Sequence, residues 1–285
     1  MLRLMTHNVW ECDDNTTSWK DAGNDCSAQA RVKGIMRVYD ETSPDVIGFQ
    51  EMTTLMADLI KEEFISRNQN YALIWGRFTP IMYNVDKFEL IDTEFYTFDE
   101  HIDGYEGIFN NDQRKSWCIV VLREKQTGKV FAFANTHLWW KRNPINEEQL
   151  KLHNFQPFSN EARQVQLMLV ANRLNYYIKK YDCPAFLVGD LNSWYSSLAI
   201  QAVLADGFEH ARYLATDFAD TSVGYHYCYP DCFKAEYSQA PFEQALDYIF
   251  AKNLKEGAIK VFKRYSPDYY FPISDHSPAF VDVEL

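Results

Sequence analysis

Ser274-Asp275-His276-Ser277-Pro278 stands close to the C-terminus, directly before the apolar run Ala279-Phe280-Val281. An apolar run of this kind predicts a terminal strand, which places Asp275 and His276 at its entrance, on one rim of a sheet. Neighbours on a strand point to opposite faces, but on a loop at the rim both side chains can reach one pocket. A lone Asp-His pair before a strand is most often an ordinary turn, so its meaning depends on the other polar clusters of the chain.

Polar residues also stand at the ends of other predicted strands. Patterning predicts strands at 2–10, 45–49, 71–75, 80–83, 88–95, 117–122, 130–135, 184–188, 246–250, 258–261 and 278–283. The polar residues at or near their ends are Asn8, Glu51, His137, Asp190, Asn192, Asp247, Asp275 and His276. Ligand sites commonly collect at strand ends, where rigid elements position loops, and this favours one shared site.

Helical periodicity appears between some of these strands. Val32, Ile35, Met36 and Tyr39 follow one helical face that ends at Ser43-Pro44, and further helices are expected at 53–64, around 167–178 and at 198–204. Helices alternating with strands in places, and hairpins in others, predict an α/β fold of two packed sheets flanked by helices. No repeat, linker or compositional break divides residues 1–285, which favours a single domain.

Composition bounds the classes of function. With 47% hydrophobic and 16% aromatic residues, the 285-residue chain is expected to fold around a sizeable core. A net charge of −12 argues against broad, sequence-independent binding of a polyanion, because such binding depends on Lys and Arg that release counterions. No apolar run is long enough for a membrane span and no signal peptide is evident, so we expect a cytoplasmic monomer, or a secreted protein if a leader was removed.

The six cysteines show no metal-ligand spacing. Cys118 and Cys183 lie in or beside apolar runs and are predicted to be buried thiols. Cys12 and Cys26 flank a polar loop, and Cys228 and Cys232 flank a Tyr-Pro-Asp segment. Spacing does not decide pairing, so free thiols, which we favour, and disulfides both stay open.

The polar residues offer the parts of a phosphoester hydrolase. Asn8, Glu51, Asp190, Asn192 and Asp275 are oxygen donors of the kind that Mg²⁺ prefers. The two histidines suit an acid/base group and a phosphate donor, and Asp247 can orient one ring. A carboxylate such as Asp247 within an apolar strand is costly without a partner.

Each feature has a plainer explanation. Asn8 can be a turn former, Glu51 can complement the dipole of the next helix, and residues 189–192 can be an ordinary turn. His137 can be a rim histidine with satisfied hydrogen bonds. A separate explanation of this kind for each feature is less economical than one shared site.

The order of these segments resembles the endonuclease/exonuclease/phosphatase superfamily over essentially the whole chain. The matching segments are Thr6-His7-Asn8-Val9, Asp45-Val46-Ile47-Gly48-Phe49-Gln50-Glu51, Asn135-Thr136-His137-Leu138, Gly189-Asp190-Leu191-Asn192, Leu246-Asp247-Tyr248-Ile249 and Ser274-Asp275-His276-Ser277-Pro278. The resemblance implies a four-layer α/β/β/α sandwich of two mainly antiparallel sheets flanked by helices. It also implies hydrolysis of a phosphoester that depends on Mg²⁺ or Mn²⁺.

The resemblance also implies roles for individual residues. It assigns the metal to Asn8, Glu51 and Asp275, water activation to Asp190, phosphate binding to Asn192 and His137, a second catalytic imidazole to His276, and orientation of one histidine to Asp247. Arg114 resembles a phosphate-reaching basic residue of the family. Apart from the resemblance, Trp139 is expected to bind substrate. Several aromatic residues can stack on a base or sugar, or simply pack their loops: Trp139, Trp140, Tyr225, Tyr227 and Tyr229.

One departure concerns residues 76–79, where many relatives carry an acidic residue and this chain has none. The favoured function is a phosphodiesterase acting on a small or single-stranded substrate, with the charge balance as the reason. The alternatives are a DNA or RNA nuclease, a binding module of the same fold without turnover, and a carbohydrate-active protein. The last requires paired carboxyl groups at the cleavage point and leaves the histidines and asparagines unexplained.

Overall fold

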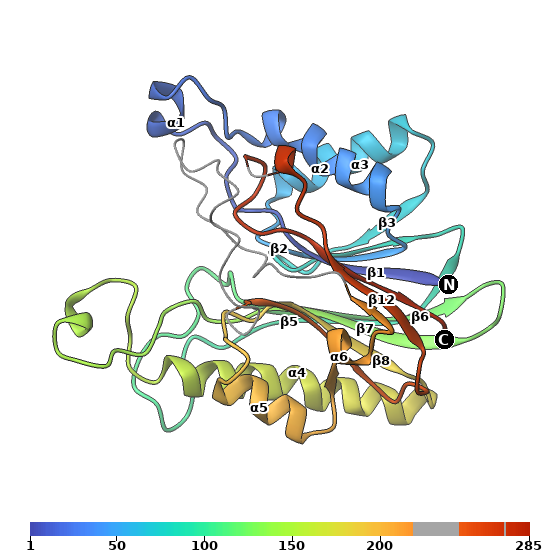
Figure 1. Cartoon of the computed structure of the whole chain (residues 1–285). Helices are drawn as coiled ribbons and strands as arrows, with labels where there is room; N and C mark the ends of the chain where they lie inside the picture. The colour runs from blue at the N-terminus through green and yellow to red at the C-terminus, as the bar shows by residue number, and fades with distance from the viewer. Residues whose placement is uncertain (219–244, 271) are drawn as a thin grey trace.

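The computed structural model of the protein describes residues 1–218, 245–270 and 272–285. Two sheets stack face to face, and helices cover the outer face of each sheet (Figure 1). This arrangement is the predicted four-layer α/β/β/α sandwich. The expectation of a single domain over residues 1–285 stays a prediction.

The first sheet has the strand order β10-β12-β13-β1-β2-β4-β3. Pairs β1–β2 and β10–β12 are parallel, and the other neighbours are antiparallel. Its strands are β1 (Leu2–Asn8), β2 (Val46–Gln50), β3 (Tyr71–Ile74), β4 (Ile81–Asn84), β10 (Asp217–Phe218), β12 (Ile259–Arg264) and β13 (Ala279–Val283).

The second sheet has the order β5-β6-β7-β8-β11-β9, with β7–β8 as its parallel pair. Its strands are β5 (Phe88–Thr97), β6 (Ser116–Glu124), β7 (Val130–His137), β8 (Ala185–Asp190), β9 (Glu209–His210) and β11 (Asp247–Lys252).

The long helices form the outer layers. Helices α2 (Ala28–Thr42) and α3 (Thr54–Ser66) pack on the first sheet, and α4 (Ser159–Tyr181) and α5 (Leu198–Ala205) pack on the second. The side chains of Ser27 and Thr53 accept hydrogen bonds from the first turns of α2 and α3, which fixes where these helices begin.

The central strands β2, β6, β7 and β8 are buried on both faces, which explains their continuous apolar runs. In β1, Leu4 belongs to the core between the sheets, whereas its neighbour Met5 packs against the helices. The sheets approach closely at Gly48, where an added Cβ would lie 2.8 Å from Asn135 Cγ. Asn135 donates to the backbone of Phe49 and accepts from Gln50, so this contact joins the two sheets by buried hydrogen bonds.

The predicted strands and long helices are confirmed, with ends that shift by a few residues. Four short elements lie outside the predicted strands and helices. They are α1 (Thr17–Asp21), which lies in the polar loop between Cys12 and Cys26, and β9, α6 (Ala211–Leu214) and β10. These elements are too short to show a period. Tyr225, Tyr227, Tyr229, Cys228 and Cys232 lie outside the described residues. Cys118 and Cys183 are buried, as predicted.

Within the described part of the chain, no helix has the length and hydropathy needed to cross a membrane.

Candidate functional site

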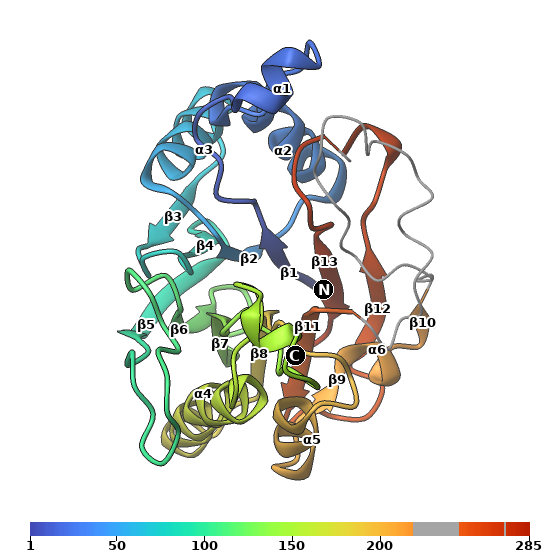
Figure 2. The same cartoon turned by 90° about the vertical axis from the view of Figure 1, so that its left-hand side faces the viewer.

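The site forms where strands of both sheets end, on the side of the sandwich that faces the viewer in Figure 2. Asn8 ends β1 and Glu51 directly follows β2 in the first sheet. In the second sheet Asp190, at the end of β8, pairs in register with His137 of β7 and with Asp247 of β11. Cross-strand partners point to the same face of a sheet, so strand pairing alone gathers these three side chains.

Asp190 is the centre of this group. Its carboxylate accepts hydrogen bonds from Asn8 Nδ2 at 3.1 Å and from the backbone N–H of Asn192 at 2.9 Å. The Nε2 atoms of His137 and His276 lie 3.5 Å and 3.7 Å from Asp190 Oδ2. Burial raises the pKa of Asp190 to about 6, with His276 opposing this rise and Asp247 adding to it. A carboxylate with this pKa suits a general base near neutral pH.

His276 is the histidine that Asp247 orients, which the sequence left open. The two are joined by a hydrogen bond of 2.8 Å between His276 Nδ1 and Asp247 Oδ2. Burial lowers the pKa of His276, but the charges of Asp247 and Asp190 outweigh it, and the pKa lies well above its usual range. His276 therefore carries a proton on both ring nitrogens, and its Nε2 is a donor that faces Asp190.

His137 has the opposite character. Burial, followed by the charge of Lys115, holds its pKa well below the usual range, so the ring is neutral. Its Nε2 lies 2.6 Å from Lys115 Nζ and 3.1 Å from Asn192 Nδ2. Both groups are donors, and in the tautomer that carries its proton on Nδ1 the ring offers them one shared acceptor at Nε2. An anionic oxygen would offer these donors a further acceptor.

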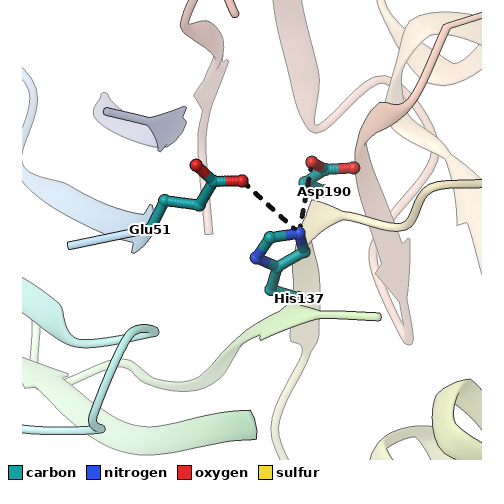
Figure 3. Close-up of side chains that lie close together, drawn as sticks. All are labelled: Glu51, His137 and Asp190. Atoms are coloured by element: carbon teal, nitrogen blue, oxygen red, sulfur yellow. Dashed lines mark ion pairs between the residues drawn. The ribbon is translucent and has the colours of Figure 1, made fainter. Parts of the chain in front are cut away.

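Figure 3 shows the carboxylates of Glu51 and Asp190 both directed at the same nitrogen of the His137 ring. Glu51 Oε1 lies 4.0 Å from His137 Nε2, and Glu51 Oε2 accepts from the backbone N–H of Glu11 at 3.0 Å. Glu51 and Asn192 have φ values of 58° and 48°, in the left-handed region that is uncommon for Glu and more readily adopted by Asn. Glu51 turns the chain directly after β2 and Asn192 turns it two residues after the end of β8, and both side chains line the cavity described below.

The acidic residues fit a divalent cation. Asp275 Oδ1 is buried and has no hydrogen-bond partner among the described residues. Burial raises the pKa of this carboxyl to about 7; the charge of His276 opposes the rise, and the charges of Glu51 and Asp190 add to it. A buried acceptor of this kind is costly unless something compensates it. Glu51, His137 and Asp190 also bring ligand atoms within 4.8 Å of one another. Glu51 and Asp275 offer the hard oxygen donors that Mg²⁺ and Mn²⁺ prefer.

Asn8 is placed differently from Glu51 and Asp275. Its Nδ2 donates to Asp190, and its Oδ1 accepts from the backbone N–H of Trp10 at 3.0 Å. In this arrangement Asn8 fixes the position of Asp190, and its role toward a metal stays a prediction.

A cavity of about 500 Å³ opens above these residues. Its lining consists of Glu11, Glu51, Phe78, Asn111, Arg114, Lys115, His137, Trp140, Asp190, Asn192, Asp275 and His276. Arg114 therefore lines the cavity, half-exposed and paired with Glu11 at 3.0 Å, and its role toward phosphate stays a prediction.

Trp139 is not at the cavity, and this expectation needs correction. Its side chain is 1% exposed and packs with Phe109 and Ala162, whereas the neighbouring Trp140 is 36% exposed and lines the cavity. Both follow the end of β7, where the alternation of a strand no longer tells which side chain points inward.

Sequence reasoning missed Lys115 and Glu11. Lys115 is 7% exposed, and burial lowers its pKa to about 8, opposed by the carboxylates of Glu51 and Asp190. The available signal was its place directly before the predicted strand at 117–122, at the same rim as the other polar residues. Glu11 had a similar signal, because it directly follows the first predicted strand.

The structure is a four-layer sandwich. Carboxylates, histidines and asparagines lie where strands of its two sheets end, as in the class of protein that the sequence resembles. The chain belongs to the endonuclease/exonuclease/phosphatase family, whose family model matches residues 5–276. No curated protein gives a significant match.

Solved structures share the fold along the whole chain. An endonuclease/exonuclease/phosphatase from Bacteroides vulgatus is 20% identical, with a TM-score of 0.75 and coverage of 100% of this chain and 98% of that one. A mannosyl-6-phosphatase from Bacteroides thetaiotaomicron is 18% identical, with a TM-score of 0.73 and full coverage of both chains. D. rerio TDP2, complexed with a single-strand DNA product, is 15% identical, with a TM-score of 0.64 and coverage of 98% and 97%. At these identities the likeness establishes the fold.

Proposed function

We propose that the protein is a phosphoester hydrolase that depends on Mg²⁺ or Mn²⁺ and acts on a small substrate. The observation that carries this proposal is the placement of buried Asp190 between a charged His276 and a neutral His137, beside Glu51 and Asp275. Phosphoester hydrolysis needs a base for water, donors for the phosphoryl oxygens and compensation of negative charge, and these residues supply all three.

Glu51 and Asp275 would hold the cation, with Asn8 beside them. When bound, the cation supplies neutralisation of the charge that develops on the phosphoryl group. Asp275 brings a carboxylate oxygen that has no other described partner, so it gains most from such a ligand.

The remaining residues act on water and on the phosphoryl group. Asp190 accepts a proton from the attacking water, and Asn8 and the Asn192 backbone hold its carboxylate in place. His276 donates from Nε2 toward a phosphoryl oxygen, while Asp247 fixes its ring and stabilises its charge. Lys115 and Asn192 donate to the other phosphoryl oxygens. Without substrate both groups lie at the same nitrogen of His137, and a phosphoryl oxygen gives them a further acceptor.

The size of the cavity supports a small substrate. About 500 Å³ lies within the range of small-molecule sites, and its rim presents Arg114, Trp140 and Asn111 to the group beyond the phosphate. A small phosphodiester is our first candidate. A single-stranded nucleic acid end is the second candidate, because Trp140 offers a stacking surface and D. rerio TDP2, a structural neighbour, was solved with a single-strand DNA product.

Hydrolysis of a chromogenic phosphodiester and of its monoester, with Mg²⁺, Mn²⁺ or EDTA, tests the proposal. We expect turnover with either metal and none with EDTA. A salt titration then separates the two candidates, because binding of several phosphates weakens steeply with salt and binding of one small ester does not. A folded protein that binds the cation and turns over no phosphoester, including a panel of nucleotides and sugar phosphates, would instead be a binding module.

Replacing Glu51 by Gln is expected to weaken Mn²⁺ binding by roughly 10- to 100-fold, because the cation loses a charged oxygen ligand. Isothermal titration calorimetry of the metal alone measures this without any substrate. The matched control is Glu89→Gln, which removes an exposed carboxylate paired with Arg123. Equal Mn²⁺ affinity in the wild type and Glu51→Gln would contradict the assignment of this residue to the metal.

Replacing Lys115 by Met is expected to lower kcat/KM by roughly 10- to 100-fold, because a charge-assisted hydrogen bond to the phosphoryl group is lost. Lys115→Arg keeps the charge and is expected to retain more activity than Lys115→Met. Inhibition by inorganic phosphate gives an independent measure, since its inhibition constant should rise in Lys115→Met. An unchanged inhibition constant would show that Lys115 does not contact phosphate.

A further inference from the structure

Two cysteines meet inside the segment that connects β1 to α2. Cys12 Sγ lies 3.5 Å from Cys26 Sγ, and the two side chains are 9% and 0% exposed. Together with Trp19 and the partly buried Trp10 they form a small hydrophobic cluster of their own. The proposed hydrolysis uses neither thiol.

The backbone around both cysteines is already held in place without a covalent bond. Buried Arg31 donates to the carbonyl oxygens of Cys12 at 2.6 Å and of Cys26 at 2.9 Å. Asn15 accepts from the backbone N–H of Cys26 and donates to the carbonyl of Asn24. These contacts bring the two ends of the segment together, so the entropy of closing the loop is lost whether or not the sulfurs are bonded.

We propose that Cys12 and Cys26 form a disulfide under oxidising conditions, which makes this pair a redox modification site. The sulfur atoms need to approach by only about 1.5 Å to reach bonding distance, and the loop between them can supply that movement. In the reaction with a disulfide oxidant such as oxidised glutathione, the two thiols give up two protons and two electrons. One S–S bond forms in the protein, the oxidant's S–S bond breaks, and the oxidant leaves as two thiols.

The position of the pair connects it to the rim of the cavity. Glu11, which directly precedes Cys12, donates its backbone N–H to Glu51 and pairs its carboxylate with Arg114. A disulfide between Cys12 and Cys26 therefore links the neighbour of Glu11, which contacts Glu51 and Arg114, to the residues directly before α2. The proposal does not rest on the proposed function, because bond formation is measured without any substrate.

The linkage is tested on the full chain, equilibrated in glutathione buffers of different redox poise and then alkylated. Tryptic cleavage after Arg3, Lys20 and Arg31 places Cys12 and Cys26 on two peptides, 4–20 and 21–31, and every other cysteine falls outside them. We expect one linked species of these two peptides in the oxidising buffer, two hydrogens lighter than their sum. Burial raises the pKa of Cys12 to about 12, so exchange is slow and long incubation is required.

Thermal unfolding gives a second readout. A disulfide that closes a loop of this length is expected to raise Tm by about 5 °C or more in the oxidised protein. Cys12→Ser and Cys26→Ser should each abolish that rise, and Cys118→Ala, which removes a buried thiol elsewhere in the core, should retain it. Full alkylation of both cysteines in the oxidising buffer would overturn the proposal, as would linkage of either one to a different cysteine. Wild-type peptide mapping keeps this decisive even if a serine variant does not fold.

Discussion

Asp190→Asn is expected to lower kcat by a factor of roughly 10² to 10⁴ while the fold stays intact. The amide keeps the shape of the carboxylate, and its carbonyl oxygen can still accept from Asn8 Nδ2. It cannot take a proton from water, however, and the charge facing His276 and His137 is lost. Steady-state kinetics with the best substrate from the ester assays measures the effect.

The matched control is Asp58→Asn, which makes the same substitution on the exposed face of α3. Circular dichroism and Tm establish that the Asp190 variant is folded. If Asp190→Asn turns over at the wild-type rate in a metal-dependent reaction, Asp190 is not the base, and the roles proposed around it are wrong.

Gly189→Ala is expected to destabilise the protein by roughly 3 to 6 kcal/mol, or to prevent folding, because two separate costs add. Gly189 has φ of 150°, which side chains rarely adopt, and an added Cβ would lie 1.9 Å from the carbonyl oxygen of Thr136 on the neighbouring strand. Backbone atoms of a central parallel pair cannot move aside as a flexible side chain can. Chemical denaturation of the purified variant measures the loss in the free energy of unfolding.

Gly104→Ala provides the comparison for the steric part of this effect. Gly104 also has a positive φ, of 85°, but nothing lies within 4 Å of its added Cβ. This variant is expected to lose about 1 kcal/mol from backbone strain alone. If both variants lost a similar free energy of unfolding, β7 and β8 would have to be farther apart at Gly189 than in this structure.

The sequence predicted the frame of the molecule because each element carries its own periodic signal. Strands buried on both faces appear as continuous apolar runs, and α2 and α4 show helical stripes. The polar residues at the strand ends then indicated which edge of the sheets holds the site. Strand pairing in register explains why His137, Asp190 and Asp247 lie together.

The parts that were missed depend on distances across the fold. Lys115 adjoins Arg114 in a polar stretch, and nothing local distinguishes the buried ammonium from the half-exposed guanidinium. The prediction of Trp139 instead of Trp140 as the cavity residue has a similar cause, because the chain after β7 has no regular period. The choice of His276 as the partner of Asp247 depends on where the loop before β13 returns, which only the assembled sheets determine.

The strand order of the first sheet has a consequence for biosynthesis. β13, the last strand of the chain, pairs with β1, the first, in the interior of its sheet. Asp275 and His276 immediately precede β13, whereas Asn8 ends β1. The chain must therefore be synthesised through β13 before these groups can meet, and a nascent chain that lacks β13 holds most of the proposed site residues without a complete site. We expect the proposed hydrolysis only after β13 is inserted between β1 and β12.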